Sequence, residues 1–191
     1  MKKYHIGIDA RFLRSRSGGF GRYTQELILH LAQIDHHNRY SVFITAEDKS
    51  EWTVKNTNFH PVIVNAKHYS VAEQTTFLKL LNSYKLDLVH FLNFNHPVRY
   101  KKPFITTLHD MTLYFFPAGR SKKSKLRHLI FRLVFRHALK GAQKVIAISK
   151  YSAADAIKHL GLDTSKITMI YEGGPAKPEY SLQQNKLVNQ Y

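Results

Sequence analysis

The segment YHIGID (residues 4–9) is followed, after a polar run, by GGFGRYT (residues 18–24). The first segment alternates and then runs apolar into Asp9, which is typical of a buried strand of a parallel sheet. The glycine cluster permits a tight turn and leaves no Cβ between the backbone and a ligand. We expect a helix from about Phe20. Its first turn directs free N–H groups and a partial positive charge at a ligand bound next to the glycine cluster. The stretch therefore predicts an anion site at the carboxyl end of the first strand.

The same glycines are also compatible with a flexible loop, and they do not form a dinucleotide fingerprint. The best alignment, Gly19-x-Gly21-x-x-Thr24, lacks the third glycine, and roughly ten residues separate the strand from the cluster instead of a tight turn. No Gly-Lys-Ser/Thr follows, which excludes a P-loop. We therefore do not expect NAD binding.

Length and composition favour one domain with one substantial core, since 43% of the 191 residues are hydrophobic. There is no cysteine, which excludes a disulfide framework and a thiolate nucleophile. The N-terminal apolar run is too short for a signal peptide, and no stretch approaches the roughly 20 apolar residues of a spanning helix. We expect a cytoplasmic protein. The 29 Lys and Arg against 13 Asp and Glu give a net charge of +16, which predicts attraction to nucleic acid, a phospholipid surface or a phosphorylated substrate.

Strand-like and helix-like segments alternate along the chain. This pattern predicts an α/β fold with a doubly wound, mostly parallel, Rossmann-like sheet of about six or seven strands over residues 1–174. Residues 175–191 are rich in Pro, Gln and Asn and are expected to be a linker or a tail, which suggests a following domain. Ser149 is expected to cap a helix that stops at Gly161. The expected strands are 4–8, 40–44, 61–64, 87–92, 103–108, 144–148 and 167–170, and the expected helices are 20–34, 73–84, 151–160 and a basic helix after the aromatic loop 111–119.

Polar residues follow several of these strands, at the edge where α/β proteins bind ligands. His109 and Asp110 follow one strand, Asn93 and its neighbours to His96 follow another, and Arg11 follows the first. An imidazole at this edge can donate to a sugar hydroxyl or a phosphate, or exchange a proton near neutral pH. The alternative is a strand-end histidine followed by an aspartate that caps the next turn.

A metal site is not expected from the sequence. There is no Asp-x-Asp pair of the kind that holds a metal on a nucleotide diphosphate. The adjacent His36 and His37 lie in a polar stretch and are better explained as a solvated turn than as a metal pair. Residues 171–174 follow the last expected strand and could line the same edge as the ends of the other strands, although a simple turn is the better interpretation there.

Four motifs together, IGIDAR (6–11), GGFGRYT (18–24), TLHD (107–110) and VIAISKYS (145–152), resemble the N-terminal half of a family 4 glycosyltransferase. The resemblance covers residues 4 to about 175 in the family's order and spacing. It implies a retaining enzyme of GT-B architecture, in which two Rossmann-like domains face each other across a cleft. Such an enzyme moves a hexosyl group from a nucleotide-diphosphate sugar to a glycan or a lipid-linked acceptor, and no cofactor is expected.

The resemblance also implies roles for individual positions. The glycines would lie near the donor diphosphate and the acceptor, the imidazole would reach the transferred sugar or the acceptor hydroxyl, and two arginines would help to hold anionic groups. With one asparagine added from its place at a strand end, the candidate site comprises the catalytic residues His109 and Asp110 and the donor- or acceptor-binding residues Gly18, Gly19, Gly21, Arg22, Arg11 and Asn93.

The second domain of such an enzyme is not in this sequence. In the family that domain carries most of the nucleotide contacts, including an Arg/Lys pair and two glutamates seven residues apart. We therefore expect this chain alone to bind donor weakly and not to turn over. Its partner would be a C-terminal Rossmann domain, either in the same polypeptide or as a separate chain.

A basic stretch marks a second possible interface. Ten Lys or Arg occur from Arg120 to Lys150, and no Asp or Glu occurs between Asp110 and Asp155. The stretch is interpreted either as a sheet-covering helix with a solvated charged face or as a helix lying on anionic lipid. Its apolar stripe is Leu126, Leu129, Ile130, Leu133 and Val134, and the candidate membrane or anion contacts are Lys122, Lys123, Lys125, Arg132 and Arg136.

Two functions from other classes compete with the transferase. The charge of +16 is compatible with a nucleic-acid-binding module, although no recognisable nucleic-acid motif occurs. The other competitor is a non-catalytic domain that docks onto a partner through an open cleft face. Salt-titrated binding to DNA, RNA and nucleotide sugars would separate these functions from the transferase.

Overall fold

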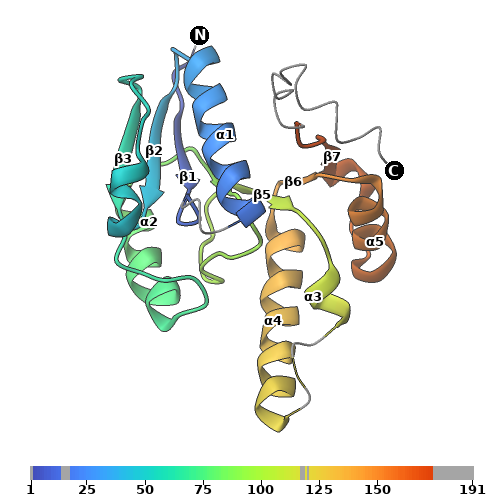
Figure 1. The fold of residues 1–191 in the computed structure, drawn as a ribbon. Helices are drawn as coiled ribbons and strands as arrows, with labels where there is room; N and C mark the ends of the chain where they lie inside the picture. Colours follow the sequence, from blue (N-terminus) through green and yellow to red (C-terminus); the bar gives the residue numbers. More distant parts are fainter. Residues whose placement is uncertain (1, 14–17, 117–118, 120, 174–191) are drawn as a thin grey trace, which may run out of the picture.

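Seven parallel strands form one sheet in the part of the chain that the computed structural model describes, residues 2–13, 18–116, 119 and 121–173. The expected fold class is confirmed, and every neighbouring pair of strands runs parallel. The strand order is β3-β2-β1-β4-β5-β6-β7 (Figure 1). The expected tail, residues 175–191, lies outside the described residues. The strands are β1 His5–Asp9, β2 Arg39–Ile44, β3 Phe59–Ile63, β4 Leu88–Phe91, β5 Phe104–Leu108, β6 Lys144–Ala147 and β7 Ile167–Met169.

The order of the strands reverses between β1 and β4. The chain first builds outward from β1 to β2 and β3, then returns to place β4 on the other side of β1. Asp9 at the end of β1 pairs in register with Phe91 at the end of β4. This reversal is the point where open parallel sheets form a crevice at the carboxyl ends of their strands.

Helices pack on both faces of the sheet (Figure 1). On one face α1 forms a core with β1 and β2, and its members include Ile8, Ile28 and Val42. On the other face α2, α4 and α5 contribute to a larger core that includes Phe91 and Phe135. The helical elements are α1 Gly18–Ile34, the 3₁₀ turn η2 Ala46–Glu51, the π-helical turn η3 Glu73–Phe77, α2 Leu78–Ser83, α3 Thr112–Phe115, α4 Lys122–Gly141, α5 Lys150–Leu160 and the 3₁₀ turn η4 Thr164–Lys166.

Both expected helix ends of α5 are confirmed. The Ser149 side chain accepts a hydrogen bond from the Ser152 amide, and Gly161 ends the helix in the left-handed conformation with φ 62°. Two boundaries differ from the expectation. The glycine pair Gly18–Gly19 belongs to the first turn of α1 and not to a loop before it, and the aromatic loop after β5 contains the one-turn helix α3.

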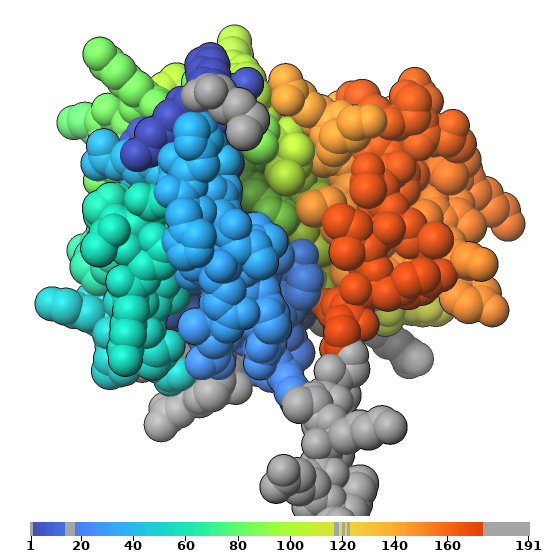
Figure 2. All heavy atoms as spheres, turned by 90° about the horizontal axis from the view of Figure 1, so that it is seen from above, coloured from blue at the N-terminus to red at the C-terminus, as the bar shows by residue number. Residues whose placement is uncertain are grey.

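The α1 side of β5, β6 and β7 is only partly covered by the described residues. Thr107 on β5 contacts Tyr23 of α1, so Ile105, two residues earlier, lies on the same face, and so does Ile146, the register partner of Thr107. Both isoleucines are only half-buried. Figure 2 shows the hollow over this part of the sheet, with the green segment visible between blue α1 and the orange-to-red C-terminal part.

Helix α4 covers the sheet, but only one residue of its apolar stripe faces the core. Phe135, Ala138 and Leu139 are buried in the larger core, and Phe131 and Val134 pack against it. The remaining four stripe residues point away from the core, because a helix that buries the Phe131–Phe135 side presents the opposite side to solvent. Those four are Leu126, Leu129, Ile130 and Leu133, which are 53% to 60% exposed.

Candidate functional site

A pocket of about 90 Å³ lies at the carboxyl edge of the sheet. Its polar lining groups are Asn93, His109 and Asp110, which follow β4 and β5 as expected. The rest of its wall is apolar or aromatic and comes from the segment after β1, the start of α1, the loop before η3, the β4 and β5 ends, α3 and α4. Those residues are Phe12, Phe20, Tyr69, Phe94, Leu108, Leu113, Phe131 and Phe135.

The His109 ring is held on several sides. Its Nε2 donates to the Leu92 carbonyl at 2.9 Å, because a carbonyl can only accept. Its Nδ1 lies 3.2 Å from Glu172 Oε1. The rings of Phe20 and Tyr23 meet the imidazole edge-on, with centroids 4.7 and 4.9 Å away. The Leu92 carbonyl therefore keeps a proton on Nε2, and Nδ1 is the ring nitrogen that faces Glu172. Nδ1 can donate to that carboxylate only when the ring carries a second proton.

A buried hydrogen-bonded chain lies behind this histidine. The Tyr23 hydroxyl and the Thr107 hydroxyl are 3.0 Å apart, and Thr107 Oγ1 is 2.9 Å from His90 Nε2. Burial lowers the pKa of His90 to about 4, so this imidazole is neutral at physiological pH. On the other side, Ser152 Oγ of α5 donates to the His109 carbonyl at 2.8 Å. Through these contacts, α1, β5 and α5 together hold the His109 ring in place.

The glycine stretch and the imidazole lie at the same edge of the sheet. Phe20 directly follows Gly19 and contacts the His109 ring. Gly18 has φ 59°, a left-handed conformation that favours glycine, and an added Cβ at Gly18 or Gly19 would meet nothing within 4 Å. The exposed first turn of α1 thus provides open backbone beside the histidine, as the sequence predicts. Gly21, by contrast, is buried.

Two candidate residues make local backbone contacts in addition to lining the pocket. Asp110 Oδ1 accepts from the Thr112 amide at 2.7 Å, which is the turn-capping role that the alternative interpretation gives it. Asn93 Oδ1 accepts from the Phe94 amide at 2.9 Å, and its Nδ2 donates to Asn95. Arg22 is exposed on the first turns of α1. Asp110 and Asn93 therefore shape the loops that form the polar end of the pocket.

Arg11 does not line this pocket. Its side chain has no exposed surface, and its guanidinium donates twice to Asp9 at 2.8 Å, to Glu73 at 2.7 Å and to the Ala66 carbonyl at 3.1 Å. Burial opposes this charge, but the two carboxylates outweigh it and raise the pKa of Arg11. The expectation that Arg11 holds an anionic ligand finds no support, because the guanidinium is enclosed by the chain's own acceptors.

The structure places beside His109 one residue, Glu172, for which the sequence favours a simple turn. Residues 171–174 are expected to be a turn, yet the Glu172 carboxylate reaches the imidazole of His109. The only signal was that this segment follows β7, at the same edge of the sheet as the ends of β4 and β5. No periodicity shows which of several polar residues after a strand turns back toward its neighbour.

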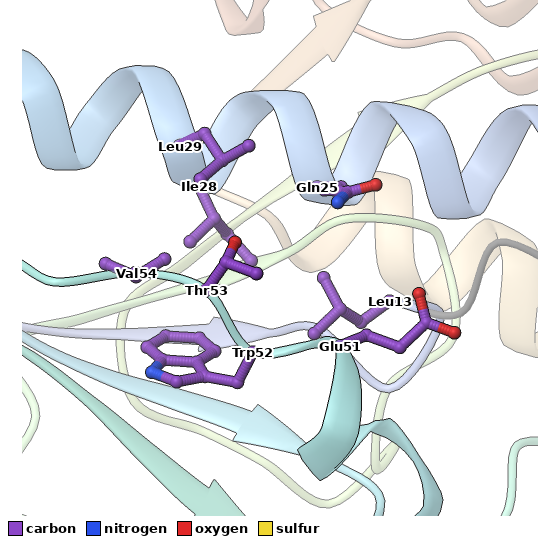
Figure 3. Close-up of a pocket in the computed structure, with 8 residues that line it drawn as sticks. All are labelled: Leu13, Gln25, Ile28, Leu29, Glu51, Trp52, Thr53 and Val54. Atoms are coloured by element: carbon purple, nitrogen blue, oxygen red, sulfur yellow. The ribbon is translucent and has the colours of Figure 1, made fainter.

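A second cavity, between α1 and the segment after η2, has a volume of only about 10 Å³ and lies away from the histidine (Figure 3). Trp52 is partly buried there and packs against the core under α1. Among the described residues there is no group of three or more His, Cys, Asp or Glu placed to hold a metal ion. Nor is any described helix both long and apolar enough to cross a bilayer.

The family model described as Glycosyltransferase Family 4 matches residues 17–174. The chain belongs to the family that this model describes. The match covers α1, all the strands after β1 and every pocket residue except Phe12. Family membership does not favour the nucleic-acid or docking alternatives. No curated protein matches the sequence.

Solved structures show the same fold at low sequence identity. A glycosyltransferase from Rickettsia africae has 16% identity and a TM-score of 0.52, over 100% of this chain and 50% of that one. HepE from Anabaena, in complex with UDP and glucose, has 16% identity and a TM-score of 0.54, over 99% and 50% of the two chains. MnaA from S. aureus, in complex with UDP, has 12% identity and a TM-score of 0.55, over 97% and 51%. The chain thus spans about half the length of these proteins and has the fold of one half of a GT-B glycosyltransferase.

Proposed function

We propose that this chain is the N-terminal, acceptor-side domain of a retaining glycosyltransferase. The complete enzyme would move a hexosyl group from a nucleotide-diphosphate sugar to a glycan or a lipid-linked acceptor, without a metal or cofactor. The second Rossmann domain would be supplied in the same polypeptide or by a separate chain. We place the enzyme in the cytoplasm, at the inner face of the membrane when the acceptor is lipid-linked. The family membership and the half-length fit to solved structures support this proposal.

The observation that carries the proposal is the environment of His109. Its Nε2 is fixed on the Leu92 carbonyl and its Nδ1 lies 3.2 Å from Glu172 Oε1, beside the open turn of α1. A hydroxyl that entered beside Nδ1 would find the imidazole as one partner and the Glu172 carboxylate as another. Hydroxyl groups of a sugar suit this pair, because a hydroxyl can donate to the carboxylate and accept from Nδ1 when that nitrogen carries a proton, or donate to Nδ1 when it does not.

The aromatic wall suits the same class of ligand. Phe12, Phe20 and Phe94 line the pocket around its polar end. Pyranose rings present apolar C–H faces to aromatic rings and hydroxyls to polar groups, so both parts of the wall have a use. We assign the exposed N–H groups at the start of α1 to the donor diphosphate, whose negative charge they attract.

Transfer activity of the complete enzyme tests the proposal. We expect His109→Ala, measured in the natural polypeptide or with the partner domain added, to lower the transfer rate by about 100-fold or more. Ile34→Gln, an exposed change at the far end of α1, is the matched control and should leave the rate unchanged. The isolated 191 residues should not turn over. Robust transfer by the isolated chain, or full activity of His109→Ala, would contradict the assignment.

Binding separates the transferase from the nucleic-acid alternative. The chain should bind DNA or RNA only through its net charge, so affinity should fall steeply with salt and show no sequence preference. Nucleotide sugars should perturb the histidine ring signals of His109 in NMR spectra and leave those of His36, which lies in the turn after α1, unchanged. Tight, salt-resistant binding of one nucleic acid would favour the alternative.

A further inference from the structure

Helix α4 presents an apolar surface to solvent on the side opposite to its packed face. Leu126, Leu129, Ile130 and Leu133 are 60%, 54%, 53% and 60% exposed. At about 100° per residue, these four side chains fall within an arc of about 100° on the helix. We call them the outer stripe. Large apolar side chains scattered singly over a surface need no explanation, but four on one arc mark an interaction surface.

The packing of α4 prevents the outer stripe from turning inward. Phe135 and Leu139 are fully buried in the larger core, and Phe131 and Phe135 also form part of the pocket wall. A rotation that covered the outer stripe would expose these rings. Figure 1 shows that the first part of α4 extends beyond the carboxyl edge of the sheet, away from the strands. The outer stripe is therefore a stable feature of the folded chain.

Exposed basic side chains lie on both sides of the outer stripe. By helical position, Lys125, Arg132 and Arg136 lie along one side of it and Lys123 and Arg127 along the other. No acidic residue occurs from Met111 to Ala154, so nothing on this helix neutralises them. Long basic side chains can keep their charges in water while their apolar stems lie along an apolar surface. Arg132 has a partner on α3, where its guanidinium lies over the Tyr114 ring at 4.6 Å.

We propose that the outer stripe of α4 inserts into the surface of an anionic phospholipid bilayer. Apolar side chains flanked by basic ones are complementary to a layer whose interior is apolar and whose headgroups are negative. A second copy of this chain is a poor occupant, because two surfaces of a chain with a net charge of +16 would be brought together. Two further apolar residues are exposed close by, Leu113 on α3 and Phe116 just after it.

This contact would bring the pocket next to the membrane. The inner side of α4 lines the pocket through Phe131 and Phe135, and the outer side carries the stripe. The pocket and the bilayer surface would then be about one helix diameter, roughly 10 Å, apart. An acceptor anchored in the bilayer could present its headgroup to His109 across that distance. This purpose rests on the proposed function, whereas the contact itself requires only the outer stripe and its basic flanks.

Vesicle binding by the full 191-residue chain is the first test. We expect co-sedimentation with vesicles of phosphatidylcholine mixed with phosphatidylglycerol, much weaker co-sedimentation with phosphatidylcholine alone, and weakening by salt. Lys123→Gln with Lys125→Gln and Arg127→Gln should lower the affinity by about 100-fold at low salt, at about fivefold per charge. Indifference to lipid charge would overturn the proposal.

Substitutions in the stripe separate insertion from electrostatic adsorption. The triple variant Leu129→Gln, Ile130→Gln and Leu133→Gln keeps every charge, and α4 should be retained because Gln has a good helix propensity. It should weaken vesicle binding by about 30-fold or more, because it removes apolar surface. The matched control replaces exposed apolar residues elsewhere, Ile34→Gln with Tyr151→Gln, and should change binding less than about twofold. Equal binding by the stripe variant, with an unchanged circular dichroism spectrum, would overturn the proposal.

The absence of native cysteine allows a direct test of insertion depth. An environment-sensitive fluorophore at Leu129→Cys should shift to shorter wavelength on anionic vesicles, and the same label at Val71→Cys should not. No shift at residue 129 would overturn the proposal. A dimer in sedimentation that the stripe variant abolishes would also overturn it, because a second copy of the chain would then cover the outer stripe in place of lipid. These measurements need no sugar donor. A failed transfer assay would therefore leave them intact, and failed vesicle binding would leave the transferase assignment intact.

Discussion

Removing the buried guanidinium of Arg11 is expected to destabilise the fold severely. In Arg11→Met, Asp9 and Glu73 lose the cation between them, and both carboxyl groups are at most 4% exposed. The side chain that replaces the guanidinium still fills most of the space next to Phe77, which the wild-type guanidinium covers at 4.1 Å. The expected loss is therefore electrostatic and not a cavity effect.

The magnitude follows from the contacts. The guanidinium donates four hydrogen bonds, three of them to carboxylates at 2.7 to 2.8 Å. Breaking a buried ion pair from one side typically costs about 3–5 kcal/mol, because the partner charge stays buried and unpaired. A domain of this size has a free energy of unfolding of about 5–15 kcal/mol, so the variant should lose between about a fifth and all of it. Arg11→Lys should lose less, since it keeps the charge but not the forked geometry.

Urea denaturation followed by circular dichroism measures this loss. The matched control is Lys2→Met, which removes an exposed ion pair with Asp87 at 3.7 Å and should cost less than about 1 kcal/mol.

The pH dependence of the stability of Arg11→Met gives a second readout. Burial already raises the pKa of Glu73 above 4.5, although Arg11 opposes the shift, and without Arg11 it should rise further. The folded variant then holds a proton that the unfolded chain releases, so its stability should fall as pH rises above about 4.5. A loss no larger than that of Lys2→Met, independent of pH, would refute the reasoning.

The chain should also lose stability in mild acid, because burial lowers the pKa of His68, His90 and His96 from 6.5 to about 4. Unfolded histidines bind protons first, so the free energy of unfolding should fall as pH drops from 6.5 toward 4, by up to about 4 kcal/mol per pH unit. An unfolding midpoint that stays at the same denaturant concentration from pH 6.5 to pH 4 would contradict the burial of these three histidines. Gly7→Ala should cost about 1–3 kcal/mol, since its Cβ would lie 2.9 Å from a leucine side chain behind β1. Gly19→Ala, with nothing within 4 Å, is its control and should shift the thermal midpoint little; equal losses for the two would show that crowding is not the cause.

The parallel α/β sheet was within reach of sequence reasoning, and the reason is local. Runs such as Leu88–Phe91, apolar except for His90, are typical of a parallel strand covered on both faces. The cap at Ser149 and the stop at Gly161 depend on side-chain and backbone chemistry that a single residue type supplies. Alternation of strands and helices then leaves few possible topologies.

The directions of side chains were much less predictable. The periodicity of α4 gives an apolar arc, but it does not say whether that arc or the one with Phe135 meets the sheet. The aromatic rings are larger and bury more surface, and they took the inner position. Arg11 has the charge and the position of a residue that binds an anion. Its guanidinium instead donates to Glu73, which is 62 residues away in the sequence. Likewise Glu172 reaches His109 only because β5, β6 and β7 lie side by side.

The described residues cover the α1 side of β5, β6 and β7 only in part, and this has a practical consequence. Ile105 and Ile146 are half-buried there, and Ile170, just after β7, is 53% exposed. Dyes whose fluorescence increases on apolar surfaces should therefore bind to the fully folded chain and fluoresce. A dye-based melting curve would begin from a high baseline, and a bright sample at room temperature would signal this native surface and not loss of structure.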